Sequence, residues 1–260
     1  MIAALVRLAL AACLLAPASA GASTARPLVS LTASPAHVML LGSTRATIRV
    51  TNSGRGPAVV DTGRAAFALD LRGRPRIVPG ARTARVAASW LTVRPRRLAL
   101  RAGESASLVV SAALPQGAQP GDHDALVLLT TRAPHGARVA VRMRLGIIVA
   151  VRVPGAIVRR LELRRLRVRR AGRVRVLELF VANRGNVTEV LERDRVKVTL
   201  RRHGRVLARL RPRKRQLLPL TTGIEQFRYR GPVRGRVTAL AEIAPAPAGS
   251  SVHKVFRIRL

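Results

Sequence analysis

Apolar and polar residues alternate with a period of two along most of this chain, from Leu28 onward. Residues 44–51, for example, put Ala46, Ile48 and Val50 on one face and polar residues on the other. This is the period of strands with one buried and one exposed face. The same pattern recurs at 98–100, 108–110, 138–145, 161–168, 174–181, 196–200, 206–210, 227–229, 237–241 and 256–260. No segment shows a convincing helical period.

The strands fall into two sets, divided at Val153-Pro154-Gly155. About seven short strands separated by turn residues every eight to twelve positions are typical of an immunoglobulin-like sandwich. We therefore predict an all-β chain of two tandem immunoglobulin-like β-sandwich domains after an N-terminal signal peptide. The predicted boundaries are 1–20 for the signal peptide, 21–155 for the first domain and 156–260 for the second.

Two local features of the second set carry expectations of their own. The segments 196–200 and 206–210 flank His203-Gly204, which predicts a hairpin. A phase slip in the alternation near Leu177 predicts a β-bulge there.

One motif, an apolar strand ending in Asn-x-Gly, occurs once in each set of strands. Asn52 and Gly54 end one such strand, and Asn183 and Gly185 end another at the same spacing. Asn and Gly tolerate the left-handed backbone conformation that a tight turn needs. We interpret the four residues as structural turns at equivalent places in two sandwiches.

The first twenty residues have the features of a secretory signal peptide. Arg7 forms a positive n-region, residues 8–15 an apolar h-region, and residues 18–20 a small-residue cleavage site. A second interpretation is a lipobox at residues 10–13, with Cys13 lipidated. Because the apolar run continues beyond Cys13, we favour simple cleavage and an exported protein at the cell surface, in the wall or outside the cell.

Cys13 is the one cysteine of the chain, so a processed protein can form no disulfide. Roughly 240 remaining residues are enough for two hydrophobic cores. No later stretch has 18 uninterrupted apolar residues, so we expect no transmembrane anchor beyond the signal peptide.

The chain has a formal net charge of +36 from 48 basic and 12 acidic residues. All basic residues except Lys197, Lys214 and Lys254 are Arg. Together with abundant Ala, Gly, Pro and Val, this indicates a GC-rich genome, so part of the charge reflects codon usage. A field this positive also attracts polyanions.

The second domain is the more basic, with 28 basic and 7 acidic residues in 156–260 against 19 and 5 in 21–155. It is our candidate for contact with an anionic cell-wall polymer. Nucleic acid is disfavoured, because aromatic residues make up only 2% of the chain and bases would find no stacking platform. The candidate polyanion contacts are Arg201, Arg202, Arg205, Arg211, Arg213, Lys214 and Arg215.

Catalytic chemistry has little support in the sequence. The triplet Asp122-His123-Asp124 could ligate a metal or orient a base, but adjacent residues of a strand point to opposite faces. The sequence has no Gly-x-Ser-x-Gly elbow, Walker loop or dinucleotide fingerprint. We expect no enzyme activity, cofactor or metal. Trp90 could be a ligand platform, but a single Trp in a sandwich more often packs in the core.

Three segments, 89–93, 97–105 and 114–123, resemble the N-terminal domain of WxL-interacting proteins, and 181–187 with 217–219 resemble their second domain. The resemblance implies an exported, surface-associated protein of Gram-positive bacteria. It implies a first domain that resembles the sandwich of pilus-assembly chaperones and binds peptidoglycan, and a second that binds a partner or host. Proteins of this family end in a transmembrane helix, whereas we expect the last residues here, 256–260, to form a strand.

Our main functional hypothesis is a non-enzymatic, envelope-associated binding or adhesion protein that contacts a cell-wall polymer or a surface protein. The alternative is a chaperone of surface-fibre assembly. In that case the alternating segment from Val139 to Leu145 would lend its apolar residues to a subunit by strand addition.

Overall fold

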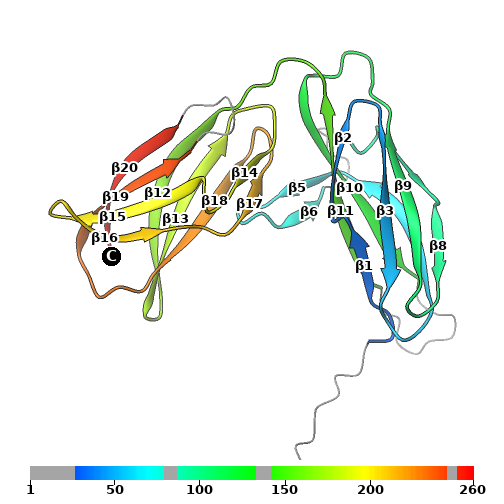
Figure 1. Ribbon diagram of the computed structural model, residues 1–260, viewed down its shortest axis with the longest axis horizontal. Coiled ribbons are helices and arrows are strands. Elements are labelled where there is room, and N and C mark those ends of the chain that lie inside the picture. The colour runs from blue at the N-terminus through cyan, green and yellow to red at the C-terminus, as the bar shows by residue number, and fades with distance from the viewer. Residues whose placement is uncertain (1–26, 79–86, 133–141, 245–250) are drawn as a thin grey trace, which may run out of the picture.

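The computed structural model describes residues 27–78, 87–132, 142–244 and 251–260. Figure 1 shows two β-sandwiches lying beside each other, and all the regular elements of the described residues are strands. The all-β fold of two tandem immunoglobulin-like sandwiches is therefore confirmed. The signal peptide with Cys13, and Val139 and Val141 of the alternating segment, lie outside the described residues.

The first sandwich has two main sheets, ordered β1-β3-β9-β7 and β2-β11-β10-β4-β8, and a separate β5–β6 hairpin. Its strands are β1 (Leu31–Ser34), β2 (His37–Leu41), β3 (Arg45–Asn52), β4 (Ala58–Ala65), β5 (Phe67–Leu69), β6 (Pro75–Ile77), β7 (Leu91–Arg94), β8 (Arg97–Leu100), β9 (Ser105–Ala112), β10 (Gly121–Thr131) and β11 (Arg144–Val153).

The first strand region divides between the two sheets. β1 pairs antiparallel with β3, and after Pro35 and Ala36 the chain continues as β2, which pairs parallel with β11. β2 is only five residues long and pairs with Ile148–Arg152, the second half of β11. The first half of β11 therefore pairs with β10 alone among the described strands.

The first core forms between these sheets from the residues that the alternation predicted. Ile48 and Val50 of β3 are fully buried and their neighbours are exposed or partly exposed, and Leu108 and Val110 of β9 repeat the pattern. Each such side chain stabilises the fold by about 1.5–3 kcal/mol relative to exposure.

The second sandwich has a sheet ordered β12-β13-β18, a β14–β17 pair and a sheet ordered β16-β15-β19-β20. Its strands are β12 (Leu161–Ala171), β13 (Val174–Asn183), β14 (Glu189–Leu191), β15 (Val196–Arg202), β16 (Arg205–Leu210), β17 (Arg215–Leu217), β18 (Thr222–Tyr229), β19 (Arg236–Ile243) and β20 (Val252–Arg259).

The hairpin predicted at His203-Gly204 is confirmed. Arg202 pairs with Arg205, and the two residues between them have φ values of 48° and 78°. Two consecutive positive φ values are those of a type I′ turn, whose twist matches that of the flanking strands.

The bulge predicted near Leu177 was wrong. β13 keeps an unbroken register through Leu177 with both β12 and β18, and the register shift lies in β12, between Leu163 and Arg165. There the carbonyls of Leu163 and Arg164 each accept a hydrogen bond from Lys254 Nζ at 3.1 Å.

The phase slip in β13 has a different cause, which is burial on both faces. Leu177 and Leu179 point into the core, whereas Phe180 is buried on the opposite face. The Arg165 guanidinium covers Phe180 at 4.0 Å from the ring centroid. A central strand covered on both sides does not need strict alternation.

The repeated Asn-x-Gly motif builds the same turn in both sandwiches. Asn52 is fully buried, accepts a hydrogen bond from Gly54 N at 3.1 Å and donates to Gly56 O at 2.8 Å. Asn183 is fully buried too, with Gly185 N as donor at 2.9 Å and Val187 O as acceptor at 2.8 Å. Each buried amide thus satisfies backbone groups that the turn removes from the ladder.

The reason we predicted for these glycines was wrong, because neither Gly54 nor Gly185 has a positive φ. Both are glycine because another backbone segment passes too close for a Cβ atom. A Cβ at Gly54 would lie 2.6 Å from Leu28 O, and one at Gly185 would lie 2.2 Å from Val158 O.

This difference predicts how Gly54 responds to substitution. Gly54→Ala should lower the free energy of unfolding by about 2 kcal/mol or more, because the added methyl group collides with backbone. Gly54→Asn should be as damaging, although Asn tolerates a left-handed turn. Gly63→Ala is the matched control, since a Cβ there meets nothing within 4 Å. Chemical denaturation measures all three, and a mild Gly54→Asn would contradict the close-approach explanation.

Candidate functional site

The seven basic residues predicted to contact a polyanion lie in two places. Arg201, Arg202 and Arg205 are exposed at the tip of the β15–β16 hairpin. The segment 211–215 connects β16 to β17 and enters the latter. The structure therefore separates the candidates into a hairpin-tip group and a connecting-segment group.

Members of the connecting-segment group already have partners within the chain. Arg211 donates to the Arg193 carbonyl, and Lys214 lies 3.5 Å from a Glu192 carboxylate oxygen.

Arg215 is mostly buried and binds the other domain. It donates to Leu71 O at 2.9 Å and to Arg72 O at 2.6 Å, and its Nε lies 3.3 Å from a Glu225 oxygen. Arg215 therefore helps to join the two domains, and its role as a polyanion contact stays a prediction.

The β5–β6 hairpin of the first domain forms this junction. Its turn residue Leu71 also accepts a hydrogen bond from Ile224 N of β18 at 2.7 Å. Beside these bonds, Phe67 and Leu126 of the first domain form a buried cluster with Leu218 of the second. Figure 1 shows β5 and β6 extending from the first sandwich towards β14 and β17.

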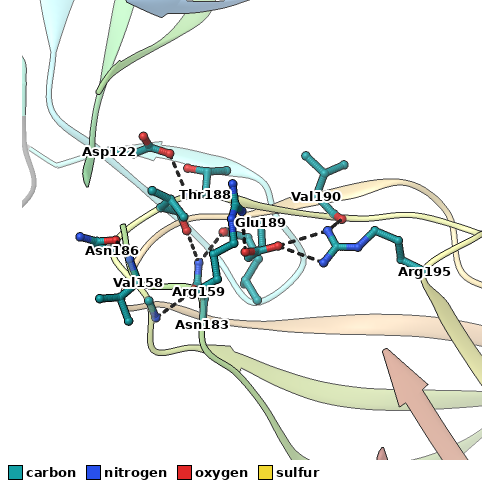
Figure 2. Close-up of polar contacts among 12 residues, drawn as sticks. Asp122, Val158, Arg159, Asn183, Asn186, Thr188, Glu189, Val190 and Arg195 are labelled. Carbon is teal, nitrogen blue, oxygen red and sulfur yellow. Dashed lines mark hydrogen bonds and ion pairs between the residues drawn. The ribbon is translucent and has the colours of Figure 1, made fainter. Parts of the chain in front are cut away.

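Asp122 forms a second junction, drawn in Figure 2. Its fully buried carboxylate accepts hydrogen bonds from Arg152 Nε at 2.6 Å and Nη2 at 2.9 Å, and from Thr188 N at 2.7 Å. Its own N–H donates to Asn186 O at 2.8 Å. One side chain therefore binds β11 of its own domain and the backbone of the other domain.

Asn186 fixes the connector between the domains, residues 154–160, which lies between β11 and β12. Its Nδ2 donates to Ala156 O at 2.8 Å and to Pro120 O at 3.1 Å, and its Oδ1 accepts from Val158 N at 2.8 Å. Gly121, with a φ of 111°, lies so close that a Cβ there would be 2.2 Å from Asn186 O.

Glu189 continues this network into the second domain (Figure 2). Its buried carboxylate pairs with Arg159 of the connector at 2.8 Å and with Arg195 at 3.1 Å. Arg195 also donates to Val190 O at 2.7 Å. A buried carboxylate held by two guanidinium groups is a strong structural contact.

The side chains of Asp122 and His123 in the Asp122-His123-Asp124 triplet point in different directions, as strand geometry requires. Asp122 faces the second domain, whereas His123 packs against Trp90 with ring centroids 4.5 Å apart and contacts Gln119 O at 2.8 Å. Trp90 is partly buried against the first core. No group of three or more potential metal ligands occurs among the described residues.

The first half of β11 is the feature best placed to bind another molecule. Met143 O accepts a hydrogen bond from Thr131 N at 2.9 Å, which fixes the phase of the β10–β11 ladder. In an antiparallel ladder the backbone groups of alternate residues point outward. The N–H and C=O groups of Arg144 and Gly146 therefore point to the edge that β2 leaves uncovered. We call the segment Arg144–Ile147 the open edge.

The side chains of the open edge alternate. Met143, just before it, and Leu145 are partly buried against the first core, whereas Arg144 and Gly146 are exposed. The sequence indicated this alternation. It did not reveal the open edge itself, which depends on how far β2 runs beside β11.

Comparison with known proteins gives similarity in structure only. No family model matches the chain, and no curated protein matches its sequence. The resemblance to WxL-interacting proteins therefore stays a prediction. The described residues include no helix long and apolar enough to cross a membrane.

Solved structures similar to this chain include fimbrial chaperones. A chaperone–tip adhesin complex of CFA/I fimbriae biogenesis has a TM-score of 0.48, with 11% identity over 87% of this chain and 98% of that one. The YadV chaperone has 0.47, with 13% identity over 88% and 99%. The Pseudomonas aeruginosa CupB2 chaperone has 0.42, with 16% identity over 88% and 100%. At TM-scores below 0.5, these likenesses carry no argument about function.

The Asp122 junction predicts a large effect of one substitution. Asp122→Ala should lower the free energy of unfolding by about 3 kcal/mol, because it leaves Arg152 and Thr188 N without their acceptor. Asp61→Ala is the matched control, since Asp61 also pairs with two arginines, Arg97 and Arg132, but at the exposed surface. It should change stability little. Equal losses in calorimetric unfolding would contradict the junction.

Glu225 predicts a pH dependence. Burial raises the pKa of Glu225 from 4.5 to about 7, and the nearby Arg215 opposes that rise. The folded state then holds the proton more tightly than the unfolded chain. The contribution of Glu225 to stability should therefore be full below pH 4.5 and be lost as the pH rises to about 7.

Glu225→Gln removes this titration. Its free energy of unfolding relative to that of the native protein should rise by up to about 3 kcal/mol between these two pH limits. Urea denaturation at several pH values measures the difference. Parallel pH profiles for the two proteins would contradict the raised pKa.

Proposed function

We propose that this chain is a non-enzymatic, exported binding protein that holds a polypeptide partner by strand addition, as a chaperone of surface-fibre assembly. The observation that carries the proposal is the open edge, Arg144–Ile147, which β2 leaves uncovered because β2 begins only opposite Ile148. An added strand would continue the sheet beyond β11.

The open edge offers main-chain hydrogen bonds from Arg144 and Gly146. Backbone bonds of this kind provide affinity in strand addition, and pockets for alternate side chains provide specificity. Leu145 lies between them and points towards the first core. A partner strand would place its own alternate apolar side chains beside Leu145 and Met143, where they would extend that core.

The junctions favour binding because they fix the open edge in advance. Arg152, in the second half of the same strand, is held by Asp122, which also binds Thr188 of the second domain. A strand that is already ordered pays less conformational entropy on binding than a mobile one. The rigid frame thus supports a role in presenting β11.

The proposal needs no catalytic group, metal or cofactor. The buried ionic side chains Asp122, Glu189 and Glu225 all contact arginines within the chain. Export is part of the proposal and rests on the signal peptide predicted at residues 1–20.

The experiment is site-specific photo-cross-linking in the source bacterium. Arg144 is replaced by p-benzoylphenylalanine in the full chain, and the cross-linked partner peptide is identified by mass spectrometry. The proposal predicts a partner segment with alternating apolar residues. Gly146→Pro should abolish the adduct, because proline removes an N–H that points to the open edge.

Ala99→Pro is the matched control. Ala99 lies on β8, the strand at the opposite edge of the same sheet. Thr62 N donates to Arg96 O, so alternation turns the N–H of Ala99 outward as well. This variant should keep the adduct. Both variants should have the same melting temperature as the unsubstituted protein. An adduct that persists in Gly146→Pro would contradict strand addition.

A further inference from the structure

Arginines gather on the outer surface of the β15-β19-β20 sheet in the second domain. We call them the arginine face: Arg201, Arg202, Arg236, Arg257 and Arg259, which line a shallow depression with His203, Val237, Thr238 and Ile258. The hairpin-tip residues predicted from sequence contribute two members. The other three come from β19 and β20, and only the strand pairing brings them there.

The strand register sets the spacing of this face. Arg236 pairs directly with Arg259, and Thr238 lies between Arg201 on one side and Arg257 on the other. Neighbouring strands are about 4.8 Å apart, so these arginines start from neighbouring backbone positions on one face of the sheet. Like charges directly opposite in a sheet destabilise it.

In the part of the chain that the structure describes, no salt bridge compensates this repulsion. Among the described residues none of the five arginines forms a salt bridge, and Arg202 has only a long bond to Arg234 O at 3.5 Å. Farther along the same two strands, Glu242 is already paired with Lys197 at 3.3 Å. The sheet thus holds an uncompensated group of cations at one end and a paired charge at the other.

We infer that the arginine face binds a linear polymer of phosphate groups. Planar guanidinium groups hold phosphate oxygens through paired hydrogen bonds. Cations spread over three strands match successive phosphates of a chain better than one isolated ion. The lining residues include no Phe, Tyr or Trp, so base stacking has no platform. This site is separate from the open edge and goes beyond strand addition.

The test is binding of fluorescent short-chain inorganic polyphosphate to the full chain at several salt concentrations. The triple variant Arg201→Gln, Arg236→Gln, Arg257→Gln should weaken binding at least tenfold at low salt. The slope of log affinity against log salt should fall by about 2, since three contacts are lost at about 0.7 each. Orthophosphate at equal phosphate concentration should compete poorly.

The matched control removes the same number of charges elsewhere. Arg211→Gln, Arg213→Gln, Lys214→Gln alters the connecting-segment group and should weaken binding no more than about twofold. A stability measurement tests the repulsion independently of binding. Arg236→Gln alone should raise the melting temperature, because it relieves the repulsion with Arg259.

Equal losses in the two triple variants would overturn the site and leave only net charge. Binding to anionic lipid vesicles without binding to polyphosphate would overturn the polymer. Competition by orthophosphate as strong as by polyphosphate would reduce the site to one for a single phosphate and would also overturn it.

Discussion

The division of the first strand region between two sheets is the constraint on which this structure depends. β1 belongs to one sheet and β2 to the other, so β2 has only five residues to place beside β11. Backbone N–H and C=O groups need partners, and a strand edge left open is a template for another strand. The open edge therefore exists because β2 is too short to pair with the whole of β11. The proposed binding mode uses this edge.

Two junctions then hold that edge in a fixed relation to the second domain. The Asp122 carboxylate binds β11 through Arg152 and the second domain through Thr188 N. The β5–β6 hairpin adds the Leu71 carbonyl, which accepts from Arg215 and from Ile224 N. The Asp122 contacts are partly buried, so they restrict rotation between the sandwiches more than surface ion pairs would.

Features that depend on neighbouring residues could be predicted from the sequence, whereas features that depend on contacts between distant segments could not. Alternation predicted the burial of Ile48 and Val50, and His203-Gly204 predicted its hairpin, because both depend on neighbouring residues. Gly54 was explained wrongly, since its requirement comes from Leu28 O in a different segment. The sequence could not show that Arg215 binds the carbonyls of Leu71 and Arg72, because those residues lie in the other domain. No pattern along the chain shows where β2 stops beside β11.

The contacts divide the arginines into two groups, those with partners inside the chain and those without a salt bridge among the described residues. Many arginines bind carbonyls or carboxylates within the chain, as Arg152 and Arg195 do. Among the described residues, those of the arginine face form no salt bridge, and Arg202 has only a long bond to Arg234 O at 3.5 Å. Codon usage, our sequence-based expectation for the abundance of Arg, does not predict that Arg236 and Arg259 pair directly across two strands.

Amide hydrogen exchange tests the central claim, the open edge, most directly. In the free full-length protein the amides of Arg144 and Gly146 should exchange rapidly, whereas that of Ile148, which donates to Ala36 O at 3.2 Å, should be protected. On addition of the partner, Arg144 and Gly146 should become protected as well. Slow exchange of both amides in the free protein, or no change on binding, would contradict the account.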